Sequence, residues 1–127
     1  YFEELMPLIE EVKKGEITTK DQKVYVIESL FLLIVDAAID INTHIISRNK
    51  LESPDDYAGT FTILGKNKII PIELADKIFG SVGLRNKMIH GYESVKRQEM
   101  LDYITNGIGQ YSEYMKCINK YVDSLKV

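Results

Sequence analysis

The chain has 127 residues, of which 45% are apolar, and it carries a formal net charge of −3. This length fits one domain with a single hydrophobic core, and we expect one helical domain over residues 1–127. The one cysteine, Cys117, excludes an internal disulfide, and no run approaches the roughly 20 apolar residues that span a bilayer. No signal peptide is visible, so we expect a cytoplasmic protein.

Charged residues are unevenly distributed along the chain. Residues 1–46 contain four basic and nine acidic side chains, whereas residues 66–97 contain seven basic and three acidic ones. The net charge alone argues weakly against a nucleic-acid partner, but a cation-rich third of the chain is what a phosphate-binding site requires. A solvated surface that happens to be basic explains the same pattern, so charge leaves both interpretations open.

The first two helices are predicted from apolar residues at alternating spacings of three and four. A short helix begins at Phe2 and fades at Lys13, and a long one begins between Thr18 and Asp21. The long helix carries two neighbouring apolar stripes, formed by Val24, Ile27, Phe31, Ile34, Ala38, Ile41 and Ile45 and by Val26, Leu30, Leu33 and Ala37. A helix that is apolar over so much of its circumference is the centre of a bundle, or a bundle member that also faces a partner subunit.

A polar stripe lies on the more polar side of this long helix. Asp36, Asp40 and His44 fall at i, i+4 and i+8, one above another. Two carboxylates and an imidazole in line can bind a divalent metal, or can hold the histidine in one tautomer. We favour a structural or cleft-lining stripe, because the chain offers no HExxH-like pair and no further clustered ligands to complete a metal site.

Two shorter helices are predicted in the middle of the chain. Ser53 is a typical N-cap and Pro54 a typical first helical residue, so a short helix should begin there. Pro71 is equally well placed to start the next helix. Gly80 and Gly83 lie inside that helix, where each costs about 1 kcal/mol against alanine. We therefore expect a close helix contact or a local bend at these glycines.

One long helix is predicted for the end of the chain. Its apolar residues keep a spacing of three and four through almost four heptads, at Leu101, Ile104, Ile108, Tyr111, Met115, Ile118, Val122 and Leu125. Gly107 and Gly109 lower the helix propensity, but the periodicity favours an uninterrupted bundle or coiled-coil helix. No run of alternating polarity predicts a strand. The fold class is therefore all-α, an up-and-down bundle of four to five helices in which the second and the last are longest.

The segment from Arg85 to Tyr92 concentrates the chemistry of the chain, because a cation, an amide, an imidazole and a phenol fall within it. We expect His90 at the C-terminal end of a helix that Gly91 closes. Asn86 and His90 share a helix face, whereas Arg85 and His90 diverge by roughly 140°. A site that uses both Arg85 and His90 therefore needs a broken last turn or a second copy of the chain.

Arginine and histidine together suit the cleavage of RNA by its own 2′-hydroxyl. His90 would move the proton as general base or acid, and Arg85 would stabilise charge on the phosphorane-like transition state, with no metal. A second imidazole could come from His44 or from His90 of a symmetry mate. Lys87, like the polar stripe on the long helix, is a candidate to line the cleft. RxxxxH by itself is a weak pattern, because its usual explanation is a helix-capping histidine beside a surface arginine.

The same segment matches the RNxxxHxY pattern of HEPN-domain proteins, and specifically resembles the HepT-like toxins of prokaryotic HEPN/MNT toxin–antitoxin pairs. Residues 37–46 resemble the long helix of that family, and residues 57–65 and 70–75 resemble its middle. The similarity extends over roughly residues 20–120 and includes every position of the motif.

The resemblance implies an α-helical bundle that dimerises so that two RxxxxH motifs line one cleft, with metal-independent endoribonuclease activity and no cofactor. Arg85 and His90 would be the catalytic pair and Asn86 their polar companion. In such type VII-like systems an MNT-type nucleotidyltransferase antitoxin neutralises the toxin by transferring AMP to the tyrosine of HxY, which is Tyr92 here. The alternative is a non-catalytic helical module that binds RNA, a nucleotide or the nucleotidyltransferase.

Overall fold

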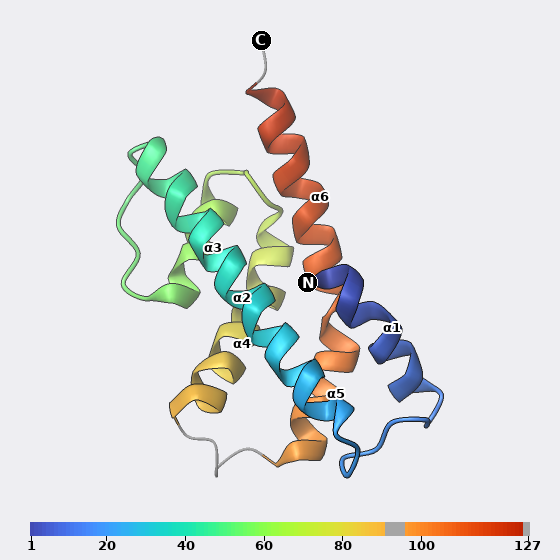
Figure 1. The fold of residues 1–127 in the computed structure, drawn as a ribbon. Helices are drawn as coiled ribbons and strands as arrows, with labels where there is room; N and C mark the ends of the chain where they lie inside the picture. The colour runs from blue at the N-terminus through green and yellow to red at the C-terminus, as the bar shows by residue number, and fades with distance from the viewer. Residues whose placement is uncertain (91–95, 126–127) are drawn as a thin grey trace.

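The computed structural model describes residues 1–90 and 96–125, which form six α-helices and no strand (Figure 1). The helices are α1 (Phe2–Lys13), α2 (Lys23–Arg48), α3 (Tyr57–Lys66), α4 (Ile72–His90), α5 (Arg97–Gly107) and α6 (Gly109–Ser124). The predicted all-α class is confirmed. None of these helices combines the length and the hydrophobicity that crossing a membrane requires.

Helix α2 is the centre of the bundle. It is 26 residues long, and Figure 1 shows it crossing the molecule diagonally, in contact with α1, α3, α4 and α5. The apolar stripe predicted from Val24 to Ile45 is buried at six of its seven positions; Ile41 is 39% exposed. The second stripe is covered less completely, because Leu30 is buried but Val26 and Leu33 are 50% and 42% exposed.

Helix α3 begins later than predicted. The expected N-cap at Ser53 is wrong: α3 starts at Tyr57, and the side chain of Asp56 accepts a hydrogen bond from the backbone N–H of Gly59 at 2.7 Å. A Cβ on Gly59 would lie only 3.2 Å from Asp56 Oδ1 and 3.5 Å from Pro54 Cβ. The glycine therefore allows Pro54 to pack on the first turn while Asp56 caps it, which places Tyr57 at the exposed start of the helix.

The predicted long terminal helix is divided. Ile108 separates α5 from α6, so the described residues form six helices rather than four or five. Ile108 keeps right-handed angles (φ −64°, ψ −26°), and the interruption lies between Gly107 and Gly109, the two residues with least preference for a helix. Helix α2 is the longest as predicted, but the next longest is α4 with 19 residues, ahead of α6 with 16.

The apolar seam of α5 and α6 is buried only in part. Its first half packs in the core, whereas Met115, Val122 and Leu125 are 39%, 43% and 48% exposed. Figure 1 shows the second half of α6, which carries Val122, extending past the other helices toward the C-terminus. The heptad pattern thus continues beyond the part of the bundle that covers it.

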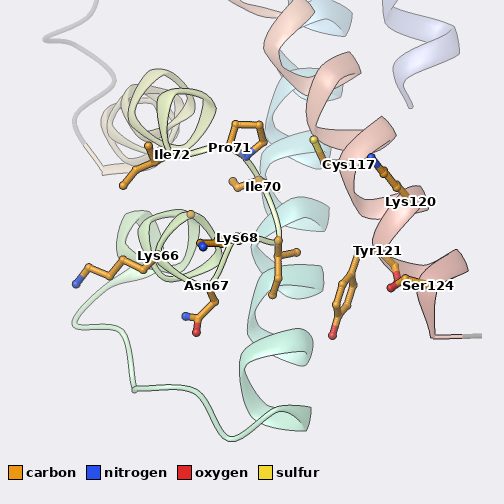
Figure 2. A pocket seen from close by; sticks show the side chains of 12 residues that line it. Lys66, Asn67, Lys68, Ile70, Pro71, Ile72, Cys117, Lys120, Tyr121 and Ser124 are labelled. Carbon is orange, nitrogen blue, oxygen red and sulfur yellow. The ribbon is translucent and has the colours of Figure 1, made fainter.

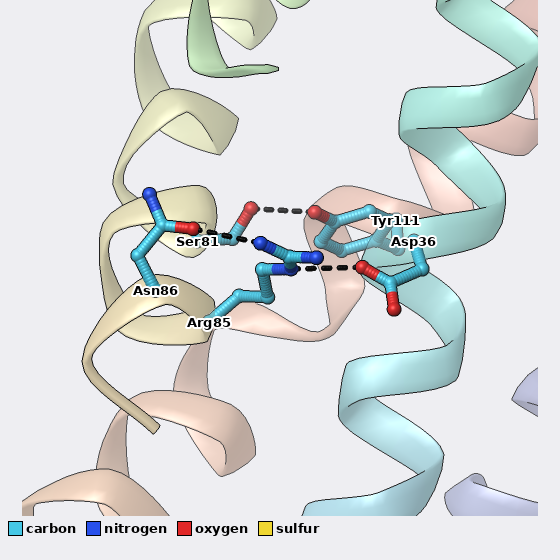
Figure 3. Close-up of polar contacts among 5 residues, drawn as sticks. All are labelled: Asp36, Ser81, Arg85, Asn86 and Tyr111. Atoms are coloured by element: carbon cyan, nitrogen blue, oxygen red, sulfur yellow. Dashed lines mark hydrogen bonds and ion pairs between the residues drawn. The ribbon is translucent and has the colours of Figure 1, made fainter. Parts of the chain in front are cut away.

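Gly80 produces the close helix contact that its position predicted. Helix α4 runs without interruption from Ile72 to His90, and a Cβ on Gly80 would lie 2.9 Å from the hydroxyl oxygen of Tyr103 on α5. A Cβ on Gly83 would meet no described atom within 4 Å. Tyr111 of α6 reaches the same region and hydrogen-bonds to the buried Ser81 of α4 (Figure 3).

Candidate functional site

Arg85 is held between two helices. Its Nε donates a hydrogen bond to Asp36 Oδ1 of α2 at 2.8 Å, and its Nη1 donates to Asn86 Oδ1 at 2.9 Å (Figure 3). The arginine side chain is only 16% exposed, whereas that of Asp36 is 45% exposed. The structure thus brings together three sequence-predicted site residues, two neighbours in the motif and one carboxylate that lies 49 positions earlier in the chain.

The two hydrogen bonds leave part of the guanidinium available. Arginine has five N–H donors, and the contacts to Asp36 and Asn86 use two of them. The remaining three have no hydrogen-bond partner among the described residues, so they can donate to an oxyanion that reaches the guanidinium. Because Asp36 is half-exposed, its pair with Arg85 stabilises the fold by no more than about 1 kcal/mol. The main physical effect of the pair is to fix where the cation points.

Tyr57 completes this arrangement, and sequence reasoning did not identify it as a site residue. The guanidinium carbon of Arg85 lies 5.4 Å from the centre of the Tyr57 ring, within the range of a cation–π contact. Tyr57 is 55% exposed although it is aromatic. We call Arg85, Asp36 and Tyr57 the Arg85 cluster; helices α4, α2 and α3 contribute one residue each.

His90 is the last residue of α4 and is exposed, as its place before a glycine predicted. It has no hydrogen-bond partner in the part of the chain that the structure describes. Because α4 stays α-helical up to His90, the last turn is not broken, and Arg85 and His90 keep the divergence expected for five positions. Of the two ways to join these side chains in one site, a second copy of the chain remains.

The polar stripe on α2 is divided in the structure. Asp36 pairs with Arg85, whereas Asp40 and His44 are exposed and have no partner among residues 1–90 and 96–125. Within these residues no three His, Cys, Asp or Glu side chains lie close enough together to hold a metal ion. A metal site built on the stripe therefore receives no support. Lys87, which lies between Asn86 and His90 in the motif, is exposed on α4.

Two motif positions cannot be placed in this geometry. Tyr92, the predicted site of modification, and Gly91 both lie outside the described residues. The next described residue after His90 is Lys96, the N-cap of α5. The segment that joins α4 to α5 therefore begins next to His90 and ends next to Arg97.

A second cluster of an arginine, a carboxylate and a tyrosine lies at the start of α5. Arg97, the first residue of α5, has its Nε 3.2 Å from Oε1 of Glu28 on α2, and its guanidinium carbon is 4.4 Å from the centre of the Tyr25 ring. Glu28 is buried, with only 6% of its surface exposed. We call Arg97, Glu28 and Tyr25 the Arg97 cluster; it fixes the start of α5 on α2.

A basic surface groove lies apart from both clusters. It has a volume of about 750 Å³ and separates α6 from the segment that links α3 to α4 (Figure 2). Lys66, Lys68 and Lys120 lie along it, and Lys66 also pairs with Glu52 at 3.4 Å. Cys117 lines the groove, and partial burial raises the pKa of its thiol, which makes it a poor nucleophile. No residue predicted for the site lines this groove.

A protein-family model matches most of the chain. The family is described as "Ribonuclease HepT-like", and its model matches residues 1–118. That range includes all described residues of the Arg85 cluster, together with His90. It extends almost the whole length of the chain, from α1 into the second half of α6.

Two curated relatives are similar in sequence. The chain is 41% identical over 101 residues to the "tRNA nuclease HepT" of Aphanizomenon flos-aquae, covering 78% of this chain and 67% of the relative. It is 28% identical over 83 residues to the "mRNA nuclease HepT" of Shewanella oneidensis, covering 65% of this chain and 62% of the relative. The matched part thus spans about two thirds of the length of each relative.

A solved structure shares the fold. The "tri-AMPylated Shewanella oneidensis HEPN toxin in complex with MNT antitoxin" superposes with a TM-score of 0.79. The match covers 94% of this chain and 91% of the other, at 22% sequence identity. At this identity the likeness establishes the arrangement of the helices.

Proposed function

Because this chain belongs to the ribonuclease HepT-like family, whose model matches residues 1–118, we propose that it is an RNA-cleaving toxin that acts as a homodimer. The family read from the RNxxxHxY segment is thereby confirmed, and two curated relatives carry nuclease names. We assign the chemistry to Arg85 and His90, with Asn86 in support and without a metal ion.

The observation that carries this proposal is the fixed orientation of Arg85. Asp36 and Asn86 hold its guanidinium at 2.8 and 2.9 Å and leave three N–H donors for a phosphodiester. A planar fork that is already oriented binds two phosphate oxygens and loses little further entropy on binding. It can therefore stabilise the charge that develops when a 2′-hydroxyl attacks the neighbouring phosphorus.

His90 supplies the proton transfer in this scheme. As general base it removes the proton of the attacking 2′-hydroxyl; as general acid, from a second copy, it protonates the leaving 5′ oxygen. The new bond joins the 2′ oxygen to phosphorus and the bond to the 5′ oxygen breaks, so the products are a 2′,3′-cyclic phosphate and a 5′-hydroxyl. An imidazole can both accept and donate a proton near neutral pH, so histidine suits both steps.

A second copy is needed because Arg85 and His90 diverge on the intact α4 helix. An exposed apolar surface on α2 supports such an interface. Val26, Leu33 and Ile41 are 50%, 42% and 39% exposed, on the side of α2 that also carries Asp40 and His44. Burying these side chains against a second α2 would bring two motifs toward one cleft.

We assign the regulation to Tyr92. A cognate MNT-type nucleotidyltransferase antitoxin would transfer AMP to this phenol, two positions after His90. The added nucleotide brings a negative charge and a bulky group, which would repel RNA and block its access. Intact mass spectrometry of the protein, expressed with and without an MNT-type nucleotidyltransferase, tests this step: a mass gain that Tyr92→Phe removes is expected.

The catalytic assignment is tested by RNA cleavage in the presence of EDTA. The wild-type dimer should degrade RNA and leave cyclic phosphate ends, whereas Arg85→Ala and His90→Ala should not. Thermal unfolding followed by circular dichroism should give both variants nearly the wild-type midpoint, since His90 is exposed and the pair of Arg85 with the half-exposed Asp36 adds no more than about 1 kcal/mol. Cleavage by both variants at the wild-type rate would overturn the assignment.

A binding module without catalysis is the second candidate. The observation in its favour is that Arg85 already has a carboxylate partner in Asp36, as a purely structural arginine would. In that case His90→Ala would bind RNA as wild type does, and no preparation would cut it. Cleavage products with cyclic phosphate ends exclude this candidate.

A further inference from the structure

We propose that Tyr57 forms a nucleobase-stacking subsite beside Arg85, so that single-stranded RNA binds with a phosphate on Arg85 and a neighbouring base on the tyrosine ring. This inference rests on the proposed function, because it assigns RNA to the same site. It adds a substrate-binding residue that lies outside the RxxxxH motif, on a different helix.

The Tyr57 ring is displayed rather than buried. Tyr57 opens α3, where the Asp56 cap fixes the backbone, and it is 55% exposed. Phe61, one turn later on the same helix, is fully buried and meets the rings of Tyr111 and Tyr114. Helix α3 therefore packs its inner face with Phe61, and the core does not require an aromatic side chain at Tyr57.

The ring lies where a base would follow a bound phosphate. The guanidinium carbon of Arg85 is 5.4 Å from the centre of the Tyr57 ring, and Asp36 holds that guanidinium in place. In a nucleotide only one sugar separates the phosphate from the base. A phosphate on the free N–H groups of Arg85 thus brings an adjacent base within reach of the ring, and base–aromatic stacking strengthens binding about 5- to 100-fold per base.

Local charge favours a base over a second phosphate at this position. Asp55 and Asp56 directly precede Tyr57, and Asp56 is already used as the helix cap. Two carboxylates repel a phosphate at the start of α3, whereas a neutral base tolerates them. The Arg85 cluster therefore offers a cation for the phosphate on one side and a neutral flat surface for the base on the other.

The absence of tryptophan from the chain permits a direct test. Tyr57→Trp, made in the His90→Ala background so that RNA stays intact, keeps a flat ring and introduces the sole indole fluorophore. The probe is a single-stranded oligoadenylate of about ten nucleotides, a length typical of single-strand binding sites. Stacking of a base on the indole should quench its emission as the probe is added.

Tyr25→Trp in the same background is the matched control. Tyr25 is also 55% exposed and also lies against an arginine, but in the Arg97 cluster. We expect strong quenching with the indole at position 57 and little with the indole at position 25. Equal quenching at both positions, or none at position 57, overturns the proposal.

Affinity provides the second measurement. In the His90→Ala background Tyr57→Ala should weaken binding of the oligoadenylate about tenfold, Tyr57→Phe should retain it, and Tyr25→Ala should leave it unchanged. An abasic oligomer of the same length should bind the Tyr57→Ala and tyrosine-containing proteins equally. A tenfold difference that persists with the abasic oligomer would mean that Tyr57 acts only by positioning Arg85, and would overturn stacking.

These experiments distinguish a failure of base stacking on Tyr57 from a failure of RNA cleavage. Failure of stacking leaves cleavage by the wild-type protein, measured on its own, intact. Failure of the proposed function would appear as absent cleavage by wild type, whatever the two indoles report. Quenching at position 57 without cleavage would support the subsite in a protein that binds RNA but does not cut it.

Discussion

The two arginine clusters each contain an arginine, a carboxylate and a tyrosine, but they bury different members. In the Arg85 cluster the carboxylate side chain is 45% exposed and the arginine 16%, whereas in the Arg97 cluster the carboxylate is 8% exposed and the arginine 27%. A buried carboxylate must keep its cation, because an uncompensated charge inside a protein is very unfavourable. A half-exposed carboxylate is solvated by water and can share its cation with a ligand.

The comparison therefore separates a structural pair from one that can take part in chemistry. The buried carboxylate of Glu28 needs the positive charge of Arg97 beside it. The pair therefore fixes the start of α5 on α2. Arg85 is oriented by Asp36 but is not required by it, so the arginine remains able to bind a phosphate. The exposure of the acid, rather than the presence of an ion pair, distinguishes the two.

The largest effect is expected from exchanging each arginine for lysine. Arg85→Lys should lower kcat/KM for RNA cleavage by about 100- to 1000-fold, because an ammonium group cannot reproduce the planar fork or its orientation. Arg97→Lys should leave cleavage near the wild-type rate. Initial rates of RNA cleavage for the two variants measure this difference, and equal losses would contradict the functional distinction between the clusters.

The next effect concerns stability. Glu28→Ala should lower the free energy of unfolding by about 2 kcal/mol, because a buried charge-assisted contact is lost. Asp36→Ala should lower it by less than about 1 kcal/mol, since its pair is half-exposed. Urea unfolding followed by circular dichroism gives both values. A larger loss for Asp36→Ala would make the Arg85 cluster the structural one.

A smaller effect on catalysis tests Asp36 as a positioning residue. Asp36→Ala should lower kcat about tenfold with little change in KM, because the arginine would still bind phosphate but would be less well oriented in the transition state. Asp36→Asn should recover most of the rate, since an amide oxygen can still accept the hydrogen bond from Arg85 Nε. Equal rates for the alanine and asparagine variants would exclude this role.

The smallest effect is expected from a change in pH. It concerns the stability of the helical core that supports both clusters. Burial raises the pKa of Tyr111 and of Tyr114, so both phenols lose their protons at higher pH in the folded chain than in the unfolded one. Their contribution to stability is complete below pH ~10, the ordinary tyrosine value, and is lost as pH rises above it.

Urea unfolding at a series of pH values measures this contribution. The part due to these phenols should be constant between about pH 7 and pH 9 and should fall above about pH 10, with a smaller fall for Tyr114→Phe. Changes in cleavage rate between about pH 7 and pH 9 would then reflect the site and not ionisation of these two phenols. A fall that is the same in Tyr114→Phe would contradict the assignment to that phenol.

Local pattern determined the class of the fold and the position of the motif. Spacings of three and four predicted the helices because each reflects one helix turning an apolar face inward. The period also placed His90 at a helix end and showed that Arg85 and His90 diverge, since both statements depend only on 3.6 residues per turn. The family could be recognised from the sequence because its RNxxxHxY pattern lies within eight consecutive residues.

Tertiary structure decided which residues surround Arg85. Asp36 and Tyr57 lie 49 and 28 positions before Arg85, and only the packing of α2 and α3 against α4 brings them to it. The start of α3 at Tyr57 was missed because Asp56, and not Ser53, caps the helix. The sequence by itself therefore identified Arg85 and His90 as the candidate catalytic pair. The fold determined which side chains hold Arg85 in place.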